Sequence, residues 1–155
     1  KAQILYESGQ REAALPSAER ALALKPDAML LKVALAQSLL ETRDDLQVER
    51  AVELLKSALT QEPRYSYGWY LLSLAYAHQD NDALAKYASA ERFYALGDLE
   101  SARSFAGRAQ QDLPRNIPQW RRASDIIVVA ETQLDRRRRN QRRPRPFTNL
   151  SITAD

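Results

Sequence analysis

Residues 97–109 read GDLESARSFAGRA and are followed shortly afterwards by Pro114. The opening glycine predicts a turn, after which Ala102, Ala106 and Ala109 recur at i, i+4 and i+7 on one narrow stripe of a helix. Small side chains on such a stripe let a second helix approach closely. Pro114 ends the helix, because its ring excludes the preceding residue from helical backbone angles. The stretch therefore predicts a short helix that packs tightly against a neighbour.

The same frame occurs twice more upstream, and each copy places a proline twelve residues after its first alanine or equivalent. Three copies in phase within 155 residues indicate an internal repeat of helical units. The two further copies are Gly9, Ala14, Ala18, Ala21 and Pro26, and then Ala51, Leu55, Ala58 and Pro63.

Composition agrees with an all-helical protein and excludes several classes. The 155 residues include four glycines and no cysteine, and 45% are apolar. Without cysteine there is neither a disulfide framework nor a thiolate zinc site. No apolar run approaches the roughly 20 residues that a membrane-spanning helix needs. The length suits one domain or a short solenoid, and because the chain begins inside a helical pattern we expect it to be a piece of something longer.

Charge divides the chain into two parts. Residues 1–135 contain 16 Lys and Arg against 19 Asp and Glu, whereas residues 136–155 contain seven Arg against one Asp. The sequence pI of 9.3 therefore describes a basic tail and not the body. We expect a helical repeat domain over residues 1–135 and an Arg/Pro-rich C-terminal tail over residues 136–155.

The repeated frame resembles the second half of a tetratricopeptide repeat (TPR), and the resemblance covers roughly residues 1–134. In that family each unit is a helix pair that cannot bury its apolar face alone. The resemblance implies an all-α fold, a right-handed superhelix of about eight antiparallel helices with a concave face and a capping C-terminal helix.

Prolines, glycines and polar clusters predict the helix boundaries. Pro63 and Pro114 lie 51 residues apart, one and a half repeats, so three helices must fit between them and one must serve two units. Pro16 predicts a late start or a kink in the second helix. The repeat is three residues longer than usual between Thr42 and Val48, which predicts a surface loop there. The expected helices are residues 2–8, 11–24, 28–42, 47–60, 65–78, 83–96 and 99–112, and an eighth that starts near Pro118.

Residues 91–127 sharpen the resemblance. They are similar to the C-terminal end of bacterial BepA-like (YfgC-type) zinc metallopeptidases, which carry a TPR domain behind the protease domain. That resemblance implies the bacterial periplasm or cell envelope and chaperone-like contacts with outer-membrane proteins. The HExxH zinc motif of the protease is not in this chain. The residues that carry the similarity are Pro118, Trp120, Arg122, Ala123, Asp125 and Ile126.

Residues suited to catalysis are few. His78 is the only histidine, so a zinc site with two histidines at i and i+4 cannot form, and no second histidine exists to act as base for a serine. We interpret His78 as a surface or groove residue. We expect no catalysis, no metal and no cofactor in this chain.

A binding surface is the stronger prediction. In the TPR register the first helix of each pair faces the groove, and five tyrosines then lie on one surface. Tyrosine supplies large contact area at low entropic cost, which suits capture of a polypeptide client or of an upstream protease domain. The plainer alternative is that several of these rings fill gaps between helices. The expected groove residues are Tyr6, Gln37, Tyr67, Tyr70, Leu74, His78, Tyr87, Glu91 and Tyr94.

The family's other binding mode, a basic and asparagine clamp for a terminal carboxylate, is not expected here. The corresponding positions hold apolar, aromatic and acidic side chains instead. These are Val33, Tyr70 and Tyr87, together with Gln37, Leu74 and Glu91.

The eighth helix carries more apolar groups than a capping stripe needs. Its inward stripe is expected to be Trp120, Ala123, Ile127, Ala130 and Leu134. Further apolar residues at 126, 128 and 129 could contact a catalytic domain, a second copy of this chain as a homodimer, the tail, or the chain's own fourth or sixth helix.

The tail has seven arginines within ten residues, and Pro144 and Pro146 stop any helix. Such a block binds phosphates or anionic lipid, docks an acidic protein, or is merely solvated. The alternative function is therefore a free-standing TPR adaptor whose tail holds nucleic acid or anionic membrane. The arginines are Arg136, Arg137, Arg138, Arg139, Arg142, Arg143 and Arg145.

Overall fold

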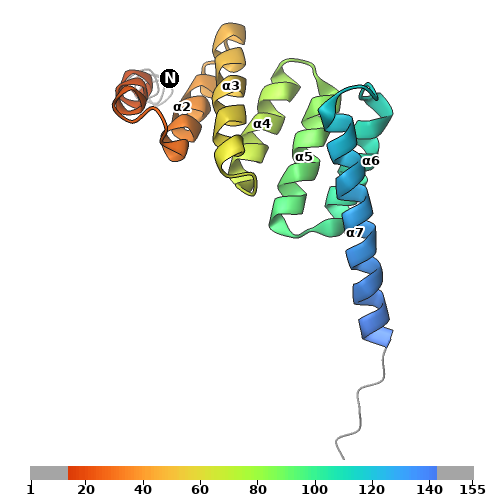
Figure 1. The fold of residues 1–155 in the computed structure, drawn as a ribbon. Coiled ribbons are helices and arrows are strands. Elements are labelled where there is room, and N and C mark those ends of the chain that lie inside the picture. The colour runs from red at the N-terminus through yellow and green to blue at the C-terminus, as the bar shows by residue number, and fades with distance from the viewer. Residues whose placement is uncertain (1–13, 143–155) are drawn as a thin grey trace, which may run out of the picture.

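A computed structural model describes residues 14–142 of the chain. The described residues form helices and no strand, so the predicted all-α class is confirmed. The helices stand side by side in chain order as an elongated row, and the end of the last one projects beyond the others (Figure 1). They are residues 14–24, α2 (Met29–Glu41), α3 (Asp45–Gln61), α4 (Ser66–His78), α5 (Asp82–Leu96), α6 (Leu99–Asp112) and α7 (Pro118–Arg142).

The prolines place the helices where the sequence predicts them. Three helices, α4, α5 and α6, lie between Pro63 and Pro114, as the spacing requires. Pro16 lies within the helix of residues 14–24, and the start expected for this helix at residue 11 lies outside the described residues. The helix expected over residues 2–8 also lies outside them.

Short polar side chains begin the helices after each tight turn. Asp44, Asn81 and Asp98 each accept a hydrogen bond from a backbone N–H three residues on, which satisfies a donor that the first helical turn leaves unpaired. Gly97 ends α5 at a φ of 77°, a left-handed conformation that glycine adopts without steric cost. These turns are short enough to keep consecutive helices in contact.

From α2 onward each helix packs on the next in the chain, and α2 also contacts α4 while α5 contacts α7. The alanine stripe of α6 is fully buried, since Ala102, Ala106 and Ala109 are each 0% exposed. Its equivalents in α3, Ala51, Leu55 and Ala58, are buried as well. In the first copy, by contrast, Ala14 is exposed and Ala18 and Ala21 are half-buried. The repeated frame thus marks buried helix positions in two of its three copies.

Helix α7 differs from the expectation in its register. Ile126 is fully buried with Ala123 and Ala130, whereas Ile127 is only half-buried and Val128 is 61% exposed. The fully buried stripe therefore runs through position 126, and Ile127, which packs against the same core, is buried only in part. Contact of α7 with both α5 and α6 buries a wider arc of the helix than one neighbour would. The helix expected sixth in the chain, residues 83–96, corresponds to α5. It was one of the predicted partners of the last helix, and the contact between α5 and α7 confirms it.

Helix α7 also continues through the expected domain boundary at residue 135 as far as Arg142, the last residue that the structure describes. The first five arginines of the basic tail are consequently helical, and those at 143 and 145 lie outside the described residues. Within the described range, no helix has both the length and the apolar character to cross a membrane.

Candidate functional site

A pocket of about 740 Å³ opens between α2 and α4, with α3 beneath it. Its deepest side chains are apolar and buried, because Val48 is 0% and Leu71 4% exposed. At its edge, Tyr67 is 40% and Leu74 45% exposed. Five of the nine predicted groove residues line this pocket. The full lining is Gln37, Leu40, Glu41, Arg43, Val48, Tyr67, Tyr70, Leu71, Leu74 and His78.

Three tyrosines follow one another along the start of α4 beside the pocket. The ring of Tyr67 lies 6.0 Å from that of Tyr70 and 6.4 Å, edge to face, from that of Tyr65. The guanidinium of Arg92, on α5, lies 4.8 Å from the centre of the Tyr70 ring. Tyr70 is therefore held between a second ring and a cation, which fixes its orientation toward the pocket.

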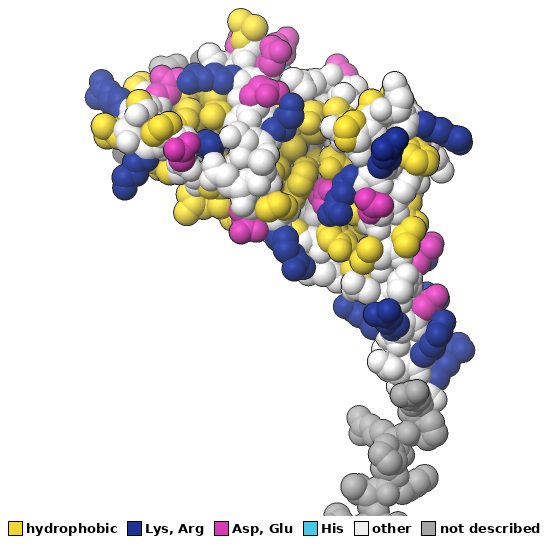
Figure 2. Space-filling view, viewed as in Figure 1, with side chains coloured by type: hydrophobic (Ala, Val, Ile, Leu, Met, Phe, Trp, Pro, Cys, Tyr) yellow, Lys and Arg dark blue, Asp and Glu magenta, His cyan; other side chains and the backbone are white. Residues whose placement is uncertain are grey.

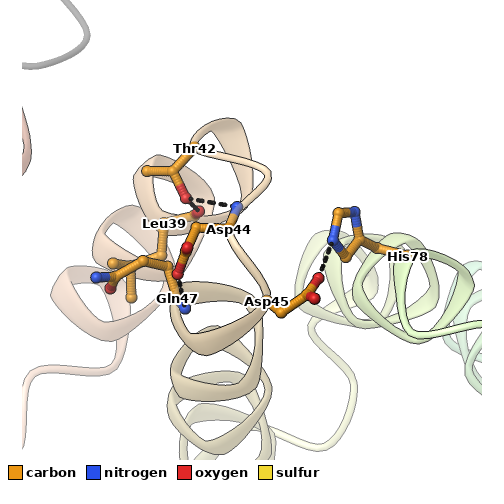
Figure 3. A network of polar contacts seen from close by, with 6 residues as sticks. All are labelled: Leu39, Thr42, Asp44, Asp45, Gln47 and His78. Atoms are coloured by element: carbon orange, nitrogen blue, oxygen red, sulfur yellow. Dashed lines mark hydrogen bonds and ion pairs between the residues drawn. The ribbon is translucent and has the colours of Figure 1, made fainter.

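The opposite edge of the pocket is the loop between α2 and α3, and polar contacts hold it in place (Figure 3). The hydroxyl of Thr42 donates to the carbonyl of Leu39 at 2.7 Å and accepts from the backbone N–H of Asp44 at 3.2 Å. Between them Arg43 has a φ of 55°, an uncommon conformation for a residue with a side chain. The loop thus presents Arg43 to the pocket at some cost in backbone strain.

The single histidine closes one end of the pocket. Its Nε2 atom lies 3.1 Å from Oδ1 of Asp45, so that the last residue of α4 is joined to the first residue of α3 (Figure 3). The described lining has no serine or cysteine that this pair could activate. Among residues 14–142 no three His, Cys, Asp or Glu side chains lie close enough to hold a metal ion.

Three of the predicted groove residues lie elsewhere. The carboxylate of Glu91 is buried, with the residue 4% exposed, and it receives two hydrogen bonds from Arg122 at 2.6 and 3.0 Å. The hydroxyl of Tyr87 donates to the same carboxylate at 3.0 Å. The Arg122 guanidinium lies 5.3 Å from the ring of Tyr94. These contacts hold α5 against α7. Tyr87, Glu91 and Tyr94 therefore pack between helices and do not line the predicted groove.

The electrostatics of this cluster follow from burial and from the carboxylate. Burial, reinforced by the charge of Glu91, raises the pKa of Tyr87. The hydrogen bond to Glu91 raises the pKa of Arg122. Tyr87 also packs edge to face on Trp69, with ring centres 5.9 Å apart, and lines a smaller hollow of about 240 Å³.

The remaining predicted residues are placed as follows. Tyr6 lies outside the described residues. Arginines 136–139 and Arg142 are exposed on α7, and Arg138 lies 4.0 Å from Asp135. The side chains that sequence reasoning missed are Arg43, Glu41 and Arg92. The three-residue insertion between Thr42 and Val48 was the one available signal, and it pointed to Arg43 alone.

Comparison with known proteins gives no family assignment. No protein-family model matches the chain, and no curated protein matches it.

Proposed function

We propose that this chain is a TPR-like interaction module, a right-handed helical superhelix whose pocket between α2 and α4 binds a segment of extended polypeptide. One observation carries the proposal. Tyr67, Tyr70 and Leu74 line the same hollow with Gln37 and His78, over a buried apolar floor.

The chemistry of the lining suits a peptide more than a small apolar ligand. Leu40, Val48 and Leu71 offer apolar contact for a side chain, whereas the amide of Gln37 can both donate to and accept from a peptide backbone. Charged groups of both signs, Arg43 and Glu41, stand at the edge. A volume of about 740 Å³ lies within the ordinary range for ligand pockets, roughly 300–1,000 Å³.

We further propose that the chain is the non-catalytic C-terminal domain of a BepA-like zinc metallopeptidase of the bacterial envelope. The support is the similarity of residues 91–127, in which Arg122 and Ile126 dock α7 onto α5 and into the core. The pocket's occupant would then be a client polypeptide or the protease domain itself. An HExxH motif on a helix encoded upstream of Lys1 would support this assignment, and an upstream region without one would contradict it.

The pocket is tested by removing two of its exposed apolar groups. Tyr67→Ala combined with Leu74→Ala should weaken binding of a labelled, reduced and carboxymethylated polypeptide by about tenfold, since interface side chains of this kind are worth more than about 1 kcal/mol on truncation. Fluorescence anisotropy gives the affinity and circular dichroism the melting temperature. Both side chains are 40–45% exposed, so the fold should be retained.

The matched control truncates two exposed apolar groups away from the pocket. Leu96→Ala with Val128→Ala removes side chains that are 57% and 61% exposed. It should leave the affinity unchanged. Equal weakening by the control pair, or unaltered binding by the pocket pair with the fold intact, would contradict the proposed site.

A further inference from the structure

The end of α7 projects beyond the other helices and is strongly basic. Leu134 is the last buried residue of the helix, and every residue from 135 to 142 is exposed. Eight helical residues extend about 12 Å. Figure 1 shows this end running past the other helices, and Figure 2 shows Lys and Arg side chains gathered on it. We call residues 135–142 the arginine segment.

The arginines surround the helix instead of forming a face. At about 100° per residue, Arg137 and Arg138 lie on the side of Leu134, where they line an open hollow of about 410 Å³ beside residues 97–100. Arg136 and Arg139 lie on the opposite side. Arg142 falls between the two sides, so no arc much wider than about 100° lacks an arginine. The segment contains no apolar residue.

Little in the described structure neutralises this charge. Of the five arginines only Arg138 has a carboxylate within ion-pair distance there, that of Asp135 at 4.0 Å. The segment therefore carries five positive charges against one negative, whereas residues 1–134 carry 16 basic against 18 acidic side chains. An anionic ligand would be attracted to the projecting end and not to the body.

We propose that the arginine segment binds duplex DNA by lying in the major groove, with its guanidinium groups paired to phosphates on both sides of that groove. A helix with its side chains is about 10–12 Å across, and the major groove of B-DNA is about 12 Å wide. Arginines all round the helix reach both phosphate walls at once. Contacts made to phosphates alone carry no sequence information, so binding is independent of sequence.

The same arrangement argues against a membrane as the ligand. A helix that lies in a lipid interface needs an apolar face, which this segment lacks. A planar anionic surface would engage only one side of a rigid helix and leave the opposite arginines in water. Duplex RNA is also a poorer fit, since its A-form major groove is deep and narrow.

Two double variants on opposite sides of the helix test whether both sides contact phosphates. The full chain is titrated against a labelled DNA duplex of about 20 base pairs, two helical turns. Arg137→Gln with Arg138→Gln removes one side, and Arg136→Gln with Arg139→Gln removes the other. Each pair should weaken binding about tenfold near 0.1 M salt and lower the slope of log K against log salt by about 1.8, two phosphate contacts.

The control variant changes the net charge by the same amount away from the segment. Arg20→Gln with Arg64→Gln removes two exposed arginines of the body and should leave both quantities unaltered. Loss of affinity in only one of the two segment pairs would indicate a one-sided contact and overturn groove binding. An equal loss of affinity in the control variant would show that net charge alone determines binding, and it would overturn the proposal.

Two further ligands complete the test. Duplex RNA of the same length and phosphatidylserine vesicles at equal charge should both bind more weakly than the DNA. Tighter binding to either would overturn the proposal, as would no binding to DNA at low salt. Sequence-selective binding that persists at about 0.3 M salt, where exposed charges are strongly screened, would overturn the claim that phosphates alone are contacted.

Discussion

At the scale of single residues, the most informative side chain is Glu91. Its place in the repeat register assigns it to the groove, yet it is 4% exposed and bonded to Arg122 and Tyr87. A buried carboxylate needs partners, because its desolvation is costly when it is left unpaired. The partner that decides its position lies 31 residues further along the chain, and no local pattern in the sequence identifies that pairing.

This cluster predicts a dependence of stability on alkaline pH. Burial and the Glu91 charge raise the pKa of Tyr87 above 10.0, so the folded state keeps the phenol neutral where the unfolded chain would ionise it. That contribution to stability is complete below pH 10 and is lost as the pH rises further. Tyr87→Phe removes it.

We therefore expect urea unfolding between pH 9 and 11 to show a smaller loss of stability in Tyr87→Phe than in the parent, by up to about 1.4 kcal/mol per pH unit above 10. Burial also raises the pKa of Tyr76. Because Tyr76 is present in both proteins, its effect cancels from the comparison. Parallel stability curves for the two proteins would mean that Tyr87 titrates normally in the folded state.

At the scale of helices, the alanine stripe is the strongest link between sequence and packing. Ala102 is 0% exposed and belongs to the cluster that joins α5, α6 and α7. A larger side chain there has no space without moving a helix. Ala102→Leu should lower the free energy of unfolding by about 1–3 kcal/mol through overpacking.

The control is the same substitution on an exposed helical position. Ala34, within α2, is exposed, so Ala34→Leu should change stability by less than about 0.5 kcal/mol. Urea unfolding followed by circular dichroism measures both variants. Similar values for the two would mean that the close contact at Ala102 is absent in solution.

Much of the helical layout was predictable because its signals are local. Prolines, Gly97 and the capping residues Asp44, Asn81 and Asp98 fix where helices begin and end. Features set by distant contacts were not predictable, among them the full burial of Ile126 in place of Ile127. The continuation of α7 through arginine-rich residues reflects their good helix propensity, which a division by charge ignores.

The pocket was predictable in part for the same reason. Tyr67, Tyr70 and Leu74 share one helix face, and the helical period brings them together without knowledge of the fold. Arg43 and Arg92 join them from other elements. Their positions depend on a left-handed residue in one case and on the packing of α5 against α4 in the other.

At the scale of the whole molecule, the two proposed binding regions lie on different helices. The pocket is formed by α2, α3 and α4, and the arginine segment is the free end of α7. Leu134 is the last buried residue of α7, so the segment contributes little to the core. Two activities on separate elements should be separable by mutation.

Deletion of residues 136–155 makes that separation testable. The shortened chain keeps Leu134 and should melt within a few degrees of the parent, because each residue removed from the described part is exposed. It should lose binding to duplex DNA at about 0.1 M salt, where phosphate contacts dominate affinity. Binding of the carboxymethylated polypeptide should be unaltered, and the pocket pair Tyr67→Ala with Leu74→Ala should show the converse. Loss of polypeptide binding on deletion would place the tail within the client site, and retention of DNA binding would locate that activity in the body.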